Sequence, residues 1–151
     1  MRLIHARTFA AICFVLLLCP ILLLAQGAQS TRISPAEMVN ALQLPKPQQP
    51  LVIQIGFRVM FQQAHIPGAE YIGPGNDAGA IEQLRKRMQP LGRDTFVVLY
   101  CGCCPWDRCP NVAPAAKALA AMGFKNVKLL HIPNDFGTDW VNRGYPVQKG
   151  G

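Results

Sequence analysis

The chain has 151 residues, of which 50% are hydrophobic, and a formal net charge of +7. This length accommodates one domain at most, because single cores are commonly built from about 100 to 200 residues. The basic residues are scattered, and their one cluster, at Arg85, Lys86 and Arg87, has no aromatic residues interleaved with it. The composition therefore argues against nucleic-acid binding, whereas a basic surface favours small anionic substrates. The sequence contains no internal repeat and no low-complexity tract.

The first segment is typical of a secretory signal peptide over residues 1–28. Two arginines precede the apolar run TFAAICFVLLLCPILLLA, and small residues follow it, with Ala25 and Gly27 as recognition positions for cleavage. An uncleaved membrane anchor is the alternative, because the run is long enough to cross a bilayer. Pro20 and the small residues after the run favour cleavage. We expect residues 29–151 to be exported as one domain, periplasmic or secreted, with membrane attachment only if the signal stays uncleaved.

Export determines the redox setting of the mature domain. Cys13 and Cys19 lie in the leader, and the other four cysteines lie between positions 101 and 109. Paired thiols persist as disulfides in an oxidising compartment. Removal of the leader also removes Arg2 and Arg7, which leaves 13 Lys and Arg against 8 Asp and Glu, a net charge of +5.

The predicted elements of the mature part alternate between helix and strand. Ser34, Pro35 and Glu37 predict a capping box on a short helix over ISPAEMVNAL. The elements that follow are a proline-rich connector, a buried strand over 51–56, a helical turn over 57–64, a brief strand around Tyr71 and Ile72, an amphipathic helix over 78–91, a strand over 95–100, an alanine-rich helix over 112–124 closed by Gly123, a strand over 126–132 and a last helical turn around Trp140. This order predicts an α/β fold with a mostly parallel central sheet flanked by helices.

The stretch YCGCCPWDRCPN places four cysteines, Cys101, Cys103, Cys104 and Cys109, between a strand and a helix. Parallel sheets carry their active loops at this end of their strands. The pKa of a thiol falls near a helix N-terminus or a cation, and both are expected here, since the helix begins near Asn111 or Val112 and Arg108 lies in the loop. Backbone amides of such a loop form a cradle for a thiolate, a persulfide or an oxyanion.

The chain resembles the rhodanese-like domain family from about Ile33 to Val147. The resemblance rests on HIPGA at 65–69, on the cysteine loop that ends in Arg, on MGFKNVKLL at 122–130 and on DWVNRGYPV at 139–147. It implies a sulfurtransferase in which a loop cysteine carries a sulfane sulfur as a persulfide from a donor such as thiosulfate to a thiophilic acceptor. The implied partners are a small sulfur-containing anion, an acceptor thiol and a reducing partner protein, and no cofactor is needed.

The resemblance leaves the identity of the sulfur-carrying cysteine open. Position after the strand favours Cys101, the first choice, whereas Cys103 satisfies the spacing of Cys, four residues, Arg108. Cys104 is a further candidate, and Cys109 is expected to be a resolving or accessory thiol. Gly102, Pro105, Trp106 and Asp107 complete the expected substrate loop.

Two positions depart from the family pattern. Gln54 and Gly56 stand where the family often carries Asp and Arg, which removes a charged pair near the site. Arg58 is the nearest replacement for that pair, although a surface role also accounts for it. His65 is expected to be structural, before the Ile-Pro-Gly turn, and His131 either faces the site or caps a strand.

Three other interpretations of the cysteines remain. Disulfides would tighten the loop, pairing Cys101 with Cys104 or either of them with Cys109, whereas adjacent Cys103 and Cys104 are poor partners. The CxxC of Cys101 and Cys104 would instead serve thiol-disulfide exchange. All four thiolates could also bind zinc or copper(I), which favour sulfur ligands.

Overall fold

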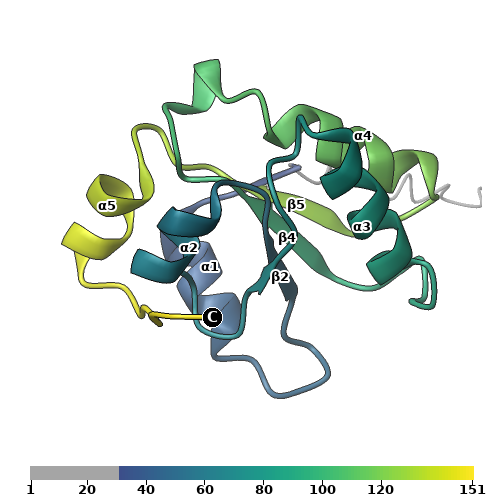
Figure 1. The fold of residues 1–151 in the computed structure, drawn as a ribbon. Helices are drawn as coiled ribbons and strands as arrows, with labels where there is room; N and C mark the ends of the chain where they lie inside the picture. The colour runs from purple at the N-terminus through teal and green to yellow at the C-terminus, as the bar shows by residue number, and fades with distance from the viewer. Residues whose placement is uncertain (1–30) are drawn as a thin grey trace, which may run out of the picture.

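The computed structural model describes residues 31–151, shown in Figure 1. The predicted signal peptide over residues 1–28 and its cleavage positions lie outside the described residues. Within 31–151, no helix is long and apolar enough to cross a membrane.

The fold is built on one five-stranded sheet in which every pair of neighbouring strands is parallel. Its strand order is β1-β5-β4-β2-β3, which places β4 at the centre. The strands are β1 (Arg32–Ile33), β2 (Leu51–Gln54), β3 (Glu70–Tyr71), β4 (Val97–Tyr100) and β5 (Val127–Leu130). Parallel neighbours require crossover connections, and the helices supply them.

Five α-helices and two short 3₁₀ helices connect and flank these strands. They are α1 (Pro35–Leu42), α2 (Arg58–Gln63), α3 (Ala78–Met88), η1 (Trp106–Arg108), α4 (Val112–Ala121), α5 (Phe136–Asp139) and η2 (Val141–Arg143). Figure 1 shows α3 and α4 together on one side of the sheet and α1 and α5 on the other. The predicted α/β class with a parallel sheet flanked by helices is therefore confirmed.

Local sequence explains how the helices begin. The Ser34 side chain accepts the N–H of Glu37, and the Glu37 carboxylate accepts the N–H of Ser34, so the predicted capping box is present. Asp77 caps α3 by accepting the N–H of Ala80 at 2.8 Å. Leu84 and Met88, one turn apart on α3, are fully buried against the sheet.

Side chains of the central strand alternate between two hydrophobic cores. Val98 and Tyr100 point into the core that α1 and α5 cover. Val97 and Leu99 point into the core that α3 and α4 cover, and Cys101 continues this second row just beyond the strand. The period of two along β4 thus aims Cys101 toward the start of α4.

The boundaries of several elements differ from the prediction. The strand expected over 95–100 begins only at Val97, because Thr95 is held in a turn by its N–H bond to the carbonyl of Gly92. The helix expected over 112–124 ends at Ala121, two residues before Gly123. The strands expected over 51–56 and 126–132 are shorter, at four residues each.

The last part of the chain contains elements that the sequence did not fully reveal. β1 was not predicted, since a strand of two residues carries no readable pattern. The single helical turn expected around Trp140 is in fact α5 followed by η2, with Trp140 between them. Trp140 is fully buried, and its indole N–H donates to the carbonyl of Pro146 at 2.8 Å. Trp140 therefore packs in the core and fixes the end of the chain.

Candidate active site

The cysteine loop leaves the central strand at its carboxyl end and leads into α4. It is tied down at both ends by main-chain hydrogen bonds. The carbonyl of Gly102 accepts the N–H of Phe136, at the start of α5, at 3.0 Å, and the carbonyl of Pro133 accepts the N–H of Trp106 at 3.1 Å. These bonds hold the loop against the segment that follows β5.

Trp106 anchors the loop. Its ring meets His131 edge-on, with 5.0 Å between ring centroids, and the guanidinium of Arg32 lies 5.1 Å from its centroid. His131 follows β5 directly and uses its ring for this contact. Both aromatic side chains therefore support the loop from the side of β1 and β5.

The sulfur atoms of all four loop cysteines converge. Every pair among them lies within 4.8 Å. The Cys101 and Cys103 Sγ atoms are 2.8 Å apart, and the Cys103 and Cys104 Sγ atoms are 3.3 Å apart. All four are free thiols. The structure thus brings together the complete set of cysteines that the sequence singled out.

The four thiols differ in their access to solvent. Cys101 is only 3% exposed, whereas Cys103, Cys104 and Cys109 are each partly exposed. Gly56, at the end of the neighbouring strand β2, makes room for Cys101: a Cβ at that position would lie 3.1 Å from the Cys101 carbonyl oxygen and 3.3 Å from its Sγ. A larger residue at this position would crowd the buried thiol.

Asn111, which sequence reasoning considered only as the start of a helix, is a central residue of the site. It is 1% exposed, and its amide Nδ2 donates to the Cys101 Sγ at 3.2 Å and to the Cys103 Sγ at 3.6 Å. Its Oδ1 accepts the N–H of Asn76 at 3.2 Å. Its side chain makes no capping hydrogen bond to α4. Asn is a common N-cap residue, so its place at a helix start gave no sequence signal for a role in the site.

The start of α4 also lies unusually close to the loop before α3. A Cβ built on Gly75 would overlap the carbonyl oxygen of Asn111, which no side chain can tolerate. The N–H of Gly75 donates to the carbonyl of Ile55 at 3.1 Å. Gly75 therefore allows the two loops to meet, and it is a second residue of the site that sequence reasoning missed.

Cys109 is the cysteine of the cluster that most readily carries a negative charge. Hydrogen bonding from the Cys101 thiol is the largest effect that lowers the pKa of Cys109. The backbone N–H groups of Asn111 and Val112 and the thiol of Cys104 lower it further. Burial opposes these effects, and the resulting pKa of Cys109 is about 5. These backbone groups belong to the first turn of α4, whose N–H groups have no partner within the helix. Cys109 is therefore a thiolate at neutral pH.

Cys101 and Cys104 are held in the opposite state. The hydrogen bond to Cys109 and burial together raise the pKa of Cys101 far above its ordinary value. Burial, followed by hydrogen bonds to Cys103 and Cys109, raises the pKa of Cys104 to about 12. The thiolate form is therefore favoured at Cys109 over Cys101 and Cys104.

The residues of the expected substrate loop differ in their exposure to solvent. Gly102 is buried, Pro105 and Trp106 are partly buried, and Asp107 and Arg108 are exposed. Within residues 31–151, Asp107 and Arg108 do not form an ion pair with each other, and the hydrogen bonds of the loop sulfurs do not involve Arg108. The Arg108 side chain is exposed, so its contribution to the site is through its charge.

The other residues that the sequence singled out are His65, Arg58 and Gln54. His65 is 2% exposed, its Nδ1 lies 2.7 Å from the carbonyl oxygen of Phe61, and its ring stacks on Phe61 at 3.8 Å, as expected of a structural histidine. The guanidinium of Arg58 lies over the ring of Tyr71, 4.4 Å from its centroid. Gln54 is buried beside the site, and its Oε1 has no hydrogen-bond partner in the described part of the chain.

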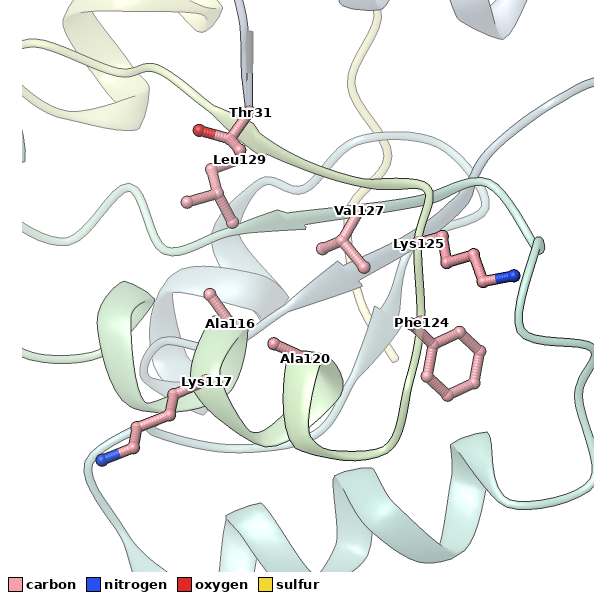
Figure 2. Close-up of a pocket in the computed structure, with 8 residues that line it drawn as sticks. All are labelled: Thr31, Ala116, Lys117, Ala120, Phe124, Lys125, Val127 and Leu129. Atoms are coloured by element: carbon pink, nitrogen blue, oxygen red, sulfur yellow. The ribbon is translucent and has the colours of Figure 1, made fainter. Parts of the chain in front are cut away.

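A cavity of about 360 Å³ lies elsewhere, between α4 and β5 (Figure 2). Figure 2 shows Ala116 and Ala120 of α4 facing Val127 and Leu129 of β5 across it, with the lysine side chains of Lys117 and Lys125 pointing away from its centre. None of the four loop cysteines lines this cavity. It is thus separate from the thiol site.

The thiol site has the composition that thiophilic metal ions prefer. Four sulfur atoms within 4.8 Å of one another suit zinc or copper(I), because soft ions favour thiolate ligands. A tetrahedral zinc site with bonds of about 2.3 Å would separate the sulfurs by roughly 3.8 Å, so the shortest pairs would have to move apart.

Comparison with known proteins assigns the chain to a family. The model of the rhodanese-like domain matches residues 34–131. No protein of curated function matches the chain.

Solved structures resemble the fold at low sequence identity. The BH2092 protein from Bacillus halodurans is 21% identical with a TM-score of 0.59, over 78% of this chain and 76% of that one. The rhodanese-like domain of the Alr3790 protein from Anabaena is 18% identical with a TM-score of 0.56, over 79% of each chain. A thiosulfate sulfurtransferase from Pseudomonas aeruginosa is 25% identical with a TM-score of 0.56 over 79% of this chain, which spans only 19% of that larger protein.

Proposed function

The chain belongs to the rhodanese-like domain family, and we propose that it is a sulfurtransferase whose cysteine loop carries a sulfane sulfur as a persulfide from a donor such as thiosulfate to a thiophilic acceptor. The observation that carries this proposal is the convergence of four free sulfur atoms at the first turn of α4. The resemblance to a thiosulfate sulfurtransferase supports thiosulfate as the first donor to test.

Cys109 is the attacking group in this proposal. The sequence favoured Cys101 for that role, but a donor in solvent cannot reach a side chain that is 3% exposed unless the loop opens. Cys109 is partly exposed, and the amides of Asn111 and Val112 hold it as a thiolate. An accessible thiolate is what nucleophilic attack requires.

The first step breaks the sulfur-sulfur bond of the donor. The Cys109 thiolate attacks the outer sulfur of thiosulfate, sulfite leaves with the electron pair of the broken bond, and the outer sulfur remains as a persulfide on Cys109. The persulfide keeps the negative charge, and the N–H groups that stabilised the thiolate stabilise it also. In a second step an acceptor thiol removes this sulfur and regenerates the Cys109 thiolate.

The setting of the reaction follows from the expected leader. If residues 1–28 direct export, the loop works in a periplasmic or extracellular compartment, where the acceptor is a thiol or another thiophile and a reducing partner protein keeps the four cysteines free. The surplus of basic residues in the mature part favours an anionic donor.

The proposal is tested by intact-mass measurement of the purified protein, reduced and freed of metal with a chelator, after exposure to thiosulfate. We expect a gain of one sulfur atom per chain at early times after mixing, together with one equivalent of sulfite, and we expect Cys109→Ser to produce neither. Val59→Ser, an exposed residue of α2 far along the chain from the loop, is the matched control and retains both.

Two rival functions predict other outcomes in the same measurement. Thiol-disulfide exchange through Cys101 and Cys104 predicts the loss of two hydrogens with no sulfur adduct at any time and no release of sulfite. A metal-binding loop predicts stoichiometric metal in the protein before the chelator is added, and no sulfur adduct afterwards. Free thiols that take up no sulfur in any form of the protein would rule out sulfur transfer from thiosulfate.

A further inference from the structure

We infer that Cys101 is a buried resolving thiol, which displaces the sulfur carried on Cys109 as hydrosulfide and closes a Cys101–Cys109 disulfide. This inference rests on the proposed function and adds a second activity to it: the loop reduces a sulfane sulfur to hydrosulfide in addition to passing it on.

Access separates the two roles. Cys101 is 3% exposed, so it cannot react with a donor or an acceptor in solvent, whereas Cys109 is partly exposed. The two sulfur atoms nevertheless lie within 4.8 Å of each other. Cys101 can therefore react only with a sulfur that a neighbouring cysteine has already brought into the loop.

The contacts of Cys101 orient it toward the carrier. Its Sγ lies within 4.8 Å of the Cys109 Sγ and 2.8 Å from the Cys103 Sγ, so the atom that would carry the persulfide is close to the buried thiol. The Asn111 amide holds the Cys101 Sγ at 3.2 Å, and Gly56 leaves the space that this sulfur occupies. Closure of the disulfide requires the two sulfurs to approach to about 2 Å.

The chemistry balances without any further reagent. The Cys101 proton passes to the sulfane sulfur of the persulfide, and the resulting Cys101 thiolate attacks the Cys109 sulfur. The bond between Cys109 and the sulfane sulfur breaks, and the sulfane sulfur leaves with the electron pair as hydrosulfide. The two cysteines are oxidised to a disulfide, and the sulfane sulfur is reduced by two electrons. A reduced chain therefore converts one thiosulfate to one sulfite and one hydrosulfide in a single turnover.

The other two cysteines are less suited to this role. Cys103 and Cys104 are partly exposed, so donors and acceptors in solvent can reach both of them. The Cys103 Sγ lies 2.8 Å from the Cys101 Sγ, and the Cys104 Sγ lies within 4.8 Å of the Cys109 Sγ, which makes both thiols competitors. The position of the disulfide decides among Cys101, Cys103 and Cys104.

The test is a single turnover of the reduced, chelator-treated protein with thiosulfate, in which the sulfur adduct, sulfite, hydrosulfide and the disulfide are all followed in time. We expect the wild-type adduct to be transient, with one hydrosulfide released per chain and a Cys101–Cys109 disulfide in the peptide map. In Cys101→Ser the adduct should persist, and hydrosulfide release should slow by at least about tenfold, because the attacking sulfur is missing. Formation of the adduct in this variant shows that its site is still folded.

Each other result is decisive. Hydrosulfide release at the wild-type rate from Cys101→Ser, a stable wild-type adduct, or a Cys104–Cys109 disulfide in the wild-type protein would overturn the assignment of Cys101 while leaving sulfur transfer intact. The absence of both adduct and sulfite in every protein would instead overturn the proposed function, and this inference with it. Cys104→Ser is expected to form the Cys101–Cys109 disulfide still.

Discussion

The side-chain amide of Asn111 donates a hydrogen bond to the Cys101 sulfur at 3.2 Å from a position that is 1% exposed. The same side chain accepts the N–H of Asn76 at 3.2 Å and thereby links the thiols to the loop before α3. Asn111 thus connects the end of β4, the start of α4 and the loop that follows β3. Three of the predictions below concern this junction and the thiolate beside it.

Replacing Asn111 should weaken both the fold and the site. Asn111→Ala removes a buried donor and a buried acceptor and leaves the N–H of Asn76 without its partner, which should lower the free energy of unfolding by about 1 to 3 kcal/mol. Urea denaturation measures this loss. Asn142→Ala, at an exposed position of η2, is the control and should have little effect. Equal stability of the two variants would contradict the role of Asn111.

Gly75 should not accept even a methyl group. In Gly75→Ala the new Cβ would overlap the Asn111 carbonyl oxygen, so the two loops must move apart, which should reduce stability by about 1 to 3 kcal/mol and slow alkylation of Cys109. Gly92→Ala is the matched control, because the nearest atom to a Cβ there is 4.0 Å away. Thermal unfolding and alkylation that are the same in both variants would show that the junction is loose.

The reactivity of Cys109 should depend on pH in an unusual range. Its pKa is lowered from 9.0 to about 5, so the thiolate is present above pH 5 and is lost as the pH falls through that value. The rate of alkylation by iodoacetamide at Cys109, followed by peptide mass spectrometry, should therefore be level at neutral pH and fall below about pH 5. Tryptophan fluorescence monitors folding over the same range. A midpoint near 9 would contradict the hydrogen bonding described for this thiolate.

Arg108 should act on the donor through its charge alone. Because its side chain is exposed and the hydrogen bonds of the loop sulfurs do not involve it, Arg108→Ala should raise the KM for thiosulfate by about fivefold at low salt, which corresponds to roughly 1 kcal/mol for one charge near the donor in water. Arg85→Ala, an exposed arginine on α3, is the control. A loss of all activity in Arg108→Ala would mean that this side chain turns inward during the reaction.

Local signals in the sequence were enough to predict much of the fold. The capping box of Ser34 and Glu37 and the burial of Leu84 and Met88 depend on neighbours within one or two helical turns, and the structure contains them as expected. β1 was missed because its two residues are strand only through pairing with Leu129 and Leu130 of β5, nearly a hundred residues away.

The sequence predicted which cysteines form the site, but it did not predict the different states of Cys101 and Cys109. The four cysteines are adjacent in sequence, so their convergence was foreseeable, whereas the difference between buried Cys101 and anionic Cys109 arises from the length of the loop and from where α4 begins. Asn111 and Gly75 contribute through a contact between two loops that are far apart in the chain. No pattern within either segment reveals such a contact.

The central claim is that the outer sulfur of thiosulfate is transferred to the loop. It is tested most directly with two preparations of thiosulfate, one carrying a radioactive label on the outer sulfur and the other on the inner sulfur, each mixed with the reduced protein. The account predicts that the outer label is found first on the protein and then in hydrosulfide or the acceptor, and that the inner label leaves as sulfite. Retention of both labels together, or of neither, would contradict it.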